Sequence, residues 1–151
     1  MHDEDCALLW RWANAPEVRE VSFETDPIPW KAHVEWFRTK RADRDCHFYI
    51  VTEKDGCPVG FVRFEVGSDG TAEVAIVIDE ERRGRGYGAA ALRIASARFL
   101  GATRASEVLA YIKPTNQASI RAFERAGFLH AGSSALRGHE AVCMRLSRTR
   151  A

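Results

Sequence analysis

A glycine- and arginine-rich segment, residues 82–88 (Arg-Arg-Gly-Arg-Gly-Tyr-Gly), lies between a predicted strand and a predicted helix. A helix N-terminus presents free backbone N–H groups and a partial positive charge. Glycines let that backbone approach a bound anion closely, and arginines add charged donors. The segment therefore predicts a site for a phosphate-bearing ligand, with a solvated basic turn as the alternative interpretation.

Two common phosphate-binding motifs do not match this spacing. A P-loop needs Gly-x-x-x-x-Gly-Lys-Ser/Thr, and residues 82–88 contain no lysine. A dinucleotide-binding turn needs Gly-x-Gly-x-x-Gly within a parallel β-α-β unit. Here the spacing is Gly-x-Gly-x-Gly, and the strand before it belongs to a predicted antiparallel meander.

A second motif follows one predicted strand later, in residues 113–119 (Lys-Pro-Thr-Asn-Gln-Ala-Ser) and 123–128 (Phe-Glu-Arg-Ala-Gly-Phe). Together the two motifs resemble those of the GCN5-related N-acetyltransferase family. The family's first signature, Arg/Gln-x-x-Gly-x-Gly/Ala, is met by Arg83, Gly86 and Gly88. Its second signature, Asn-x-x-Ser/Ala followed by a helix and Gly-Phe, is met by Asn116, Ser119, Gly127 and Phe128.

The resemblance implies acetyl-CoA as co-substrate and no metal. It places the pantetheine arm on the backbone of residues 76–78, the pyrophosphate on residues 83–88, and Asn116 on the opposite wall. Asn116 also suits a helix N-cap. The implied cofactor contacts are Ile76, Val77, Ile78, Arg83, Gly84, Arg85, Gly86, Tyr87, Gly88, Asn116, Ser119 and Phe123.

Amine attack on a thioester needs a neutral amine, a stabilised oxyanion and a protonated leaving thiolate. Glu73 is the predicted base, because desolvation among apolar strand residues would raise its pKa. An outward-facing Glu73, with water as the base, is the alternative. The predicted oxyanion donor is a backbone N–H near Val77. Many members of the resembled family carry Tyr where this chain has Phe123, so Ser119 or Tyr111 is the predicted acid, unless solvent protonates the thiolate.

Hydrophobic periodicity predicts a mixed α/β (α+β) domain over residues 1–151. The predicted helices are residues 4–14, 29–42, 86–100 and 116–126, with Pro16 interrupting the first. The predicted strands are residues 47–52, 59–66, 71–78, 107–112, 128–133 and 140–146. These elements predict a mostly antiparallel sheet with helices on both faces, and the resemblance adds a splayed parallel strand pair.

Members of this fold begin with a short strand, but here a helix starts almost at once, after Met1-His2-Asp3. We therefore expect that strand to be missing, by deletion or because the start was assigned too late. Residues 47–52 would then form a sheet edge with unpaired backbone groups. We expect another chain to cover that edge, in a possible homodimer, or the edge to be unusually mobile.

The net charge of +1 gives no field that would draw the chain to nucleic acid or membrane. No signal peptide is recognisable, so a cytoplasmic location is expected. The four cysteines lack metal-ligand spacing. The acceptor is expected to be a small-molecule amine. Residues 8–19 resemble both the branch that acetylates amino sugars on nucleotide carriers and the branch that acetylates ribosomal-protein N-termini, and residues 22–37 look more like the amino-sugar branch. The alternatives are ribosomal-protein or peptide N-termini, and a non-catalytic acyl-CoA-binding regulator.

Overall fold

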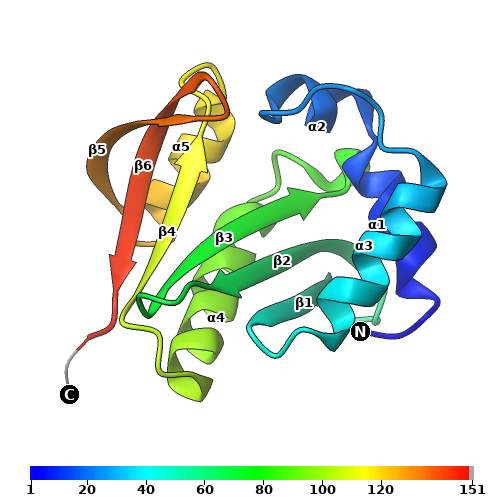
Figure 1. The fold of residues 1–151 in the computed structure, drawn as a ribbon, viewed down its shortest axis with the longest axis horizontal. Helices are drawn as coiled ribbons and strands as arrows, with labels where there is room; N and C mark the ends of the chain where they lie inside the picture. The colour runs from blue at the N-terminus through cyan, green and yellow to red at the C-terminus, as the bar shows by residue number, and fades with distance from the viewer. Residues whose placement is uncertain (150–151) are drawn as a thin grey trace.

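The computed structural model describes residues 1–149 and consists of a six-stranded sheet between two layers of helices (Figure 1). The strands are β1 (Cys46–Thr52), β2 (Pro58–Val66), β3 (Thr71–Ile78), β4 (Glu107–Ile112), β5 (Leu129–Leu136) and β6 (His139–Ser147). The helices are α1 (Asp5–Ala13), α2 (Pro16–Val21), α3 (Trp30–Ala42), α4 (Tyr87–Ala102) and α5 (Gln117–Arg125), with a short 3-10 helix, η1 (Glu80–Arg82).

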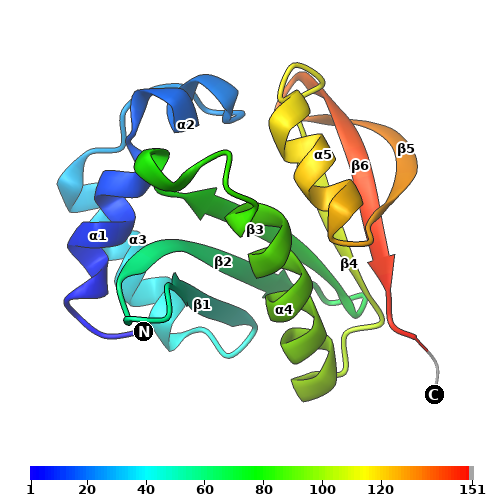
Figure 2. The ribbon, with the colours of Figure 1, turned by 180° about the vertical axis from the view of Figure 1, so that it is seen from behind.

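The sheet has the order β1-β2-β3-β4-β6-β5, and only β3 and β4 run parallel. Helices α1 and α3 cover one face, which we call the front (Figure 1), and α4 and α5 cover the back (Figure 2). The predicted fold class is therefore confirmed, including the parallel pair joined through α4.

Each helical layer encloses its own apolar core. Behind the sheet, Phe64 of β2 stacks on Phe99 of α4 with ring centroids 4.3 Å apart. In front, Leu9, Trp12 and Phe37 pack with Phe61 of β2. Because neighbouring strand residues point to opposite faces, β2 supplies both cores. This buried frame holds β3 in the middle of the sheet.

Helix α2 was not expected from the sequence. Pro16 was predicted only to interrupt the first helix, but it also occupies the first turn of α2. Proline suits that position because the first N–H groups of a helix have no partner within it. The consequence is a short helix that lies above the end of β3 (Figure 1).

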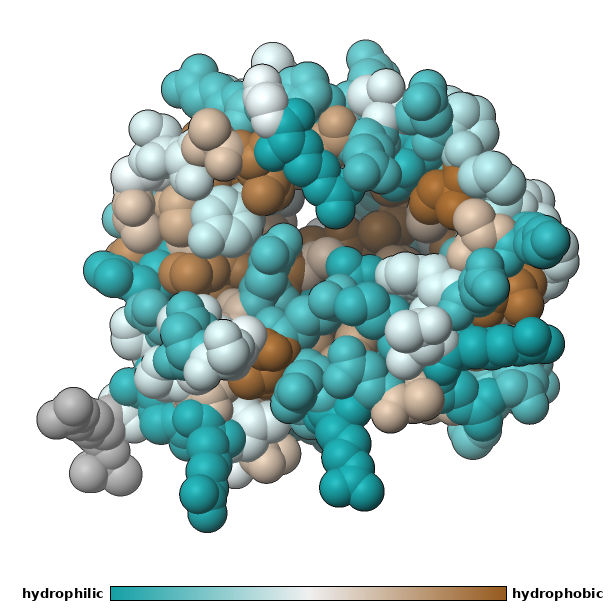
Figure 3. Space-filling view, viewed as in Figure 1, coloured by the Kyte–Doolittle hydropathy of each residue, from teal (hydrophilic) through white to brown (hydrophobic). Residues whose placement is uncertain are grey.

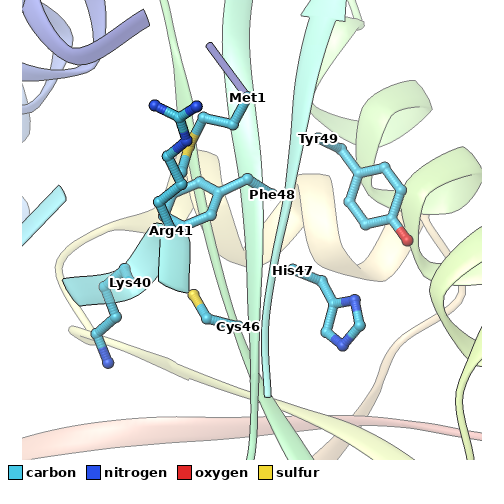
Figure 4. Close-up of a pocket in the computed structure, with 7 residues that line it drawn as sticks. All are labelled: Met1, Lys40, Arg41, Cys46, His47, Phe48 and Tyr49. Atoms are coloured by element: carbon cyan, nitrogen blue, oxygen red, sulfur yellow. The ribbon is translucent and has the colours of Figure 1, made fainter. Parts of the chain in front are cut away.

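Residues 1–5 form no strand, and β1 is an outer strand of the sheet, as expected from the sequence. Beside this edge lies a pocket of about 440 Å³, in which Met1 and Arg41 lie next to Phe48 (Figure 4). Charged side chains at a sheet edge oppose pairing with another strand. Coverage of β1 by another chain stays a prediction.

Among the described residues, no helix is both long and apolar enough to cross a membrane.

Candidate active site

The parallel strands β3 and β4 separate along their length. Their pairing is confined to residues 71–73 of β3 and 107–109 of β4. Beyond this point β3 pairs only with β2, while β4 pairs only with β6. The strands diverge into a V that opens towards α2 (Figure 1). One edge of the upper part of β3 therefore has no strand beside it.

The register shows which backbone groups face this opening. The Thr71 carbonyl and the Asp79 N–H both bond towards β2, each at 2.8 Å. Backbone direction alternates along a strand, so Ile76 and Ile78 direct their N–H and C=O groups towards β4. The cofactor contacts predicted for Ile76 and Ile78 stay predictions. Val77 needs correction, because its backbone groups point to Phe61 of β2 and cannot serve as the oxyanion donor.

The glycine- and arginine-rich turn follows β3 after Asp79 and the short helix η1. Gly84 and Gly86 have φ angles of +73° and +83°, a left-handed conformation that other residues rarely adopt. Helix α4 begins immediately afterwards, and its first amides have no carbonyl within the helix. The Arg83 Nε donates to the free Ile78 carbonyl at 3.1 Å. The turn thus presents exposed backbone donors and the guanidinium groups of Arg83 and Arg85 to solvent.

Helix α5 forms the other wall. Asn116 is its N-cap, and its side-chain oxygen accepts a hydrogen bond from the Ser119 N–H at 3.2 Å. Helices α4 and α5 both begin at the open end of the V (Figure 2). Two helix N-termini at one opening favour an anionic ligand there.

Phe123 is corrected by the structure. Its side chain is only 3% exposed and packs edge-on against Phe128, with centroids 4.9 Å apart. Phe123 is therefore a core residue, and the predicted contact with the cofactor is not supported. Its burial leaves Ser119, which is half-buried in the first turn of α5, as the hydroxyl on the back layer.

Glu73 and Tyr111 both lie on the front face, because their neighbours Ala72, Val74, Ala110 and Ile112 belong to the back core. The Glu73 side chain is exposed, which corrects the expected apolar enclosure. Desolvation still raises its pKa, and the Glu65 carboxylate raises it further, while Arg63 and Arg137 oppose the rise. Desolvation also raises the pKa of Tyr111, with Cys143 and Glu73 adding to it. Glu73 and Tyr111 therefore share one electrostatic environment at the base of the V, and Ser119 belongs to the opposite layer.

Three side-chain contacts connect the α2 region with the opposite side of the V. Arg137, in the β5–β6 turn, forms an ion pair with Glu24. The rings of Phe23 and His139 lie 6.2 Å apart, and the Lys113 Nζ lies 3.5 Å from the Glu20 carbonyl. We call these contacts the bridge. Beneath it the surface is hollowed, with apolar residues in the hollow and hydrophilic ones at the rim (Figure 3).

The bridge residues were not predicted, because Glu24 and Arg137 are 113 positions apart. The Arg137-Gly138 pair does carry a local signal, since both residues have positive φ angles, of 50° and 77°, typical of a tight hairpin turn. That signal predicts the turn. It does not predict the partner.

Comparison with known proteins settles the family. Residues 1–129 match the family model described as an acetyltransferase (GNAT) domain. The chain is 32% identical over 123 residues to the provisionally named phosphinothricin acetyltransferase YwnH of Bacillus subtilis strain 168, covering 76% of this chain and 71% of that protein. This chain belongs to the GNAT acetyltransferase family. The family resemblance predicted from its two motifs is thereby confirmed.

Solved structures agree with the GNAT fold. The aminoglycoside acetyltransferase AAC(6')-Ib, in complex with an aminoglycoside and acetyl-CoA, superposes with a TM-score of 0.85 at 21% identity, over 98% of this chain and 90% of that one. Spermidine N-acetyltransferase from Vibrio cholerae, with CoA and spermine, gives 0.85 at 17% identity, over 97% and 92%. At these identities the similarity establishes the fold of this GNAT chain, and its acceptor has to be argued from the site.

Proposed function

We propose that this GNAT chain transfers the acetyl group of acetyl-CoA to the primary amine of a small molecule. The observation that carries the proposal is the V between β3 and β4, whose open end receives the N-termini of α4 and α5. A thioester with an amide-containing arm and a diphosphate needs backbone partners along the arm and an anion site at its end. The chain offers the first along the free edge of β3 and the second in the turn and helix N-termini at the open end of the V.

The residues fit the co-substrate in chemistry. Ile76 offers its backbone N–H and C=O, and Ile78 its N–H, to the amides of the pantetheine arm, while the Ile78 carbonyl already accepts from Arg83. The amides and guanidinium groups of residues 83–88 suit the diphosphate. The side-chain oxygen of Asn116 caps α5, so we assign the contact with the arm to its amide nitrogen.

The proposed chemistry uses both sides of the V. Glu73 takes a proton from the acceptor ammonium on the front face. The amine nitrogen then attacks the thioester carbonyl carbon, and the N–H groups of Ile76 or Ile78 stabilise the oxyanion. As the tetrahedral intermediate collapses, the attacking nitrogen loses its second proton to solvent and the C–S bond breaks. The thiolate takes a proton from Ser119 on the back layer, which solvent reprotonates, or from solvent directly. A thiolate is a good enough leaving group for solvent to suffice.

The acceptor is proposed to enter through the hollow beneath the bridge, on the front face of the V (Figure 3). The named relatives are enzymes for aminoglycosides, spermidine and phosphinothricin, which are all small amines. None of them acts on a sugar nucleotide by name, so the amino sugar on a nucleotide carrier stays a prediction from the sequence alone. Peptide N-termini and a purely CoA-binding role are the remaining alternatives.

An acetyl-CoA consumption assay against an amine panel tests the proposal. The panel contains phosphinothricin, spermidine, an aminoglycoside, an amino-sugar nucleotide and a short peptide, with free CoA detected by a thiol reagent. We expect acetyl-CoA to bind and at least one amine to be acetylated in a time-dependent reaction. Acetyl-CoA binding without turnover of any amine would favour the regulator, and absence of binding would overturn the assignment of the site.

A further inference from the structure

Glu53, which directly follows β1, reaches into the phosphate turn although no motif includes it. Its Oε1 accepts a hydrogen bond from the Tyr87 hydroxyl at 2.7 Å and another from the Arg82 Nε at 3.1 Å. Arg82 ends η1 and Tyr87 begins α4. One carboxylate oxygen therefore joins the two ends of the segment that would hold the diphosphate.

The segment needs an external anchor because of its composition. Gly84 and Gly86 are conformationally free in solution, and ordering them costs more backbone entropy than ordering other residues. A site that is already ordered before the ligand arrives avoids that cost during binding. Just before the segment, the Trp12 Nε1 donates a hydrogen bond to the Asp79 Oδ2 at 2.8 Å, which anchors its beginning. The hydrogen bond between Glu53 and Tyr87 anchors its far end.

Glu53 is itself held in a tight turn. Its N–H donates to the Cys57 carbonyl and its carbonyl accepts from the Gly56 N–H, both at 2.9 Å. The Glu53 side chain is 22% exposed and that of Arg82 is 28% exposed, so solvent screens their ion pair only in part. A fixed and partly shielded acceptor is suited to hold its donors in place.

The contact with Glu53 also gives the three arginines of the turn different roles. The Glu53 carboxylate is the main cause of a raised pKa for Arg82, and its hydrogen bond is the main cause of a raised pKa for Tyr87. Arg82 is thus committed to neutralising a carboxylate that would otherwise repel a diphosphate. Arg83 and Arg85 remain exposed for the ligand.

We propose that Glu53 is a positioning residue for acetyl-CoA: it fixes Arg82 and Tyr87 so that the phosphate turn is shaped before the ligand binds. The inference rests on the proposed function, which places the diphosphate at residues 83–88. Glu53 acts through the turn and does not touch the reacting atoms.

The test compares Glu53→Ala, Glu53→Gln and Tyr87→Phe with the wild type by calorimetric titration with CoA and by steady-state kinetics. Glu81→Gln is the matched control, because Glu81 is 80% exposed and lies 4.0 Å from the same Arg82 guanidinium. It removes a neighbouring negative charge without removing the anchor. Melting temperatures of all variants check that each one is folded.

We expect Glu53→Ala to weaken CoA binding about 10-fold, as suits a partly shielded charge-assisted hydrogen bond. Glu53→Gln keeps an acceptor for Tyr87 and should lose less. The KM for the amine and kcat at saturating acetyl-CoA should stay unchanged. The double variant Glu53→Ala/Tyr87→Phe should bind no worse than Glu53→Ala, since both changes break the same contact.

A second readout needs no ligand. The ultraviolet absorbance of the phenolate reports tyrosine ionisation, and Glu53→Ala, which removes the acceptor of the Tyr87 hydroxyl, should lower the pKa of Tyr87 towards its ordinary value. Wild-type affinity in Glu53→Ala, tighter CoA binding in that variant, or an equal loss in Glu81→Gln would each overturn the inference. If the wild type itself binds no CoA, the proposed function fails, and the tyrosine titration still reports whether the anchor exists.

Discussion

Gly60 of β2 lies opposite Ile78, on the strand that supports the free edge of β3. A Cβ atom added at Gly60 would lie 2.3 Å from the Val77 carbonyl oxygen and 3.1 Å from the Ile78 Cα. Ordinary contact begins near 3.4 Å, so the two strands would have to separate by about 1 Å at this pair. Because the nearest obstructing atom is a backbone oxygen, a new rotamer of Ile78, whose Cδ1 lies 2.9 Å away, does not relieve the clash.

Gly60→Ala is therefore expected to affect both stability and activity. Crowding of this kind costs about 1–3 kcal/mol of unfolding free energy. For a domain of this size, that corresponds to a melting temperature lower by about 3–10 °C. The displaced wall carries the backbone groups of Ile76 and Ile78. A misplacement of about 1 Å at a catalytic wall lowers kcat/KM by up to about 10²-fold.

Urea unfolding followed by tryptophan fluorescence, together with kcat/KM for acetyl-CoA, measures both effects. Gly101→Ala is the control, because Gly101 lies in α4 with no atom within 4 Å of an added Cβ. Alanine there should stabilise the helix by about 0.5–1 kcal/mol and leave kcat/KM unchanged. If Gly60→Ala unfolds at the wild-type urea concentration, the close contact between β2 and β3 does not have the role assigned to it.

Three further predictions concern the site. Glu73→Gln should lower kcat by about 10²–10⁴-fold and remove the acidic limb of the pH–rate profile, because a base must be ionised and the wild-type rate rises with pH through the raised pKa of Glu73. The same raised pKa means that the folded state favours protonated Glu73, so the wild type loses stability as pH rises through that pKa. In urea unfolding, Glu73→Gln should therefore be more stable than the wild type above that pKa and show no gain at lower pH. Gly86→Val should abolish CoA binding in calorimetry through its φ of +83°, whereas Gly70→Val, with a φ of +82° in a remote turn, should leave binding intact. Arg137→Ala breaks the ion pair to Glu24, so it should raise kcat/KM for bulky amines about 2- to 5-fold and leave the affinity for CoA unchanged. A fall in kcat/KM for bulky amines would contradict the role of the bridge.

Local patterns predicted most elements of the fold, because the period of apolar residues changes clearly between helices and strands. The strand predicted at residues 128–133 extends to Leu136 because Gly132, with a φ of +94°, lies in an irregularity after which pairing with β6 resumes. The core position of Phe123 was also accessible from the sequence, since Ile120 and Phe123 lie three residues apart and both are buried on one helical face.

The sequence could not reveal the features that depend on long-range register. Side-chain alternation along β3 is visible in the residues, but the free backbone groups of Ile76 and Ile78 follow from the pairing with β2. The contact of Glu53 with Tyr87 spans 34 positions, and no periodicity connects the two residues. Motifs predicted where the ligand would lie. The surrounding scaffold that shapes the turn became visible only in three dimensions.

The bridge between the α2 region and the β5–β6 turn closes the proposed acceptor opening into a ring, where it would otherwise be a notch. A flexible molecule with its amine at one end can thread through a ring, whereas a lysine on the surface of a folded protein cannot be laid in from the side. The Arg137 and Glu24 side chains of the bridge are exposed, so their ion pair weakens as ionic strength rises. Salt should therefore help wide acceptors to pass and make little difference to slender ones, so that selectivity for acceptor shape depends on the buffer.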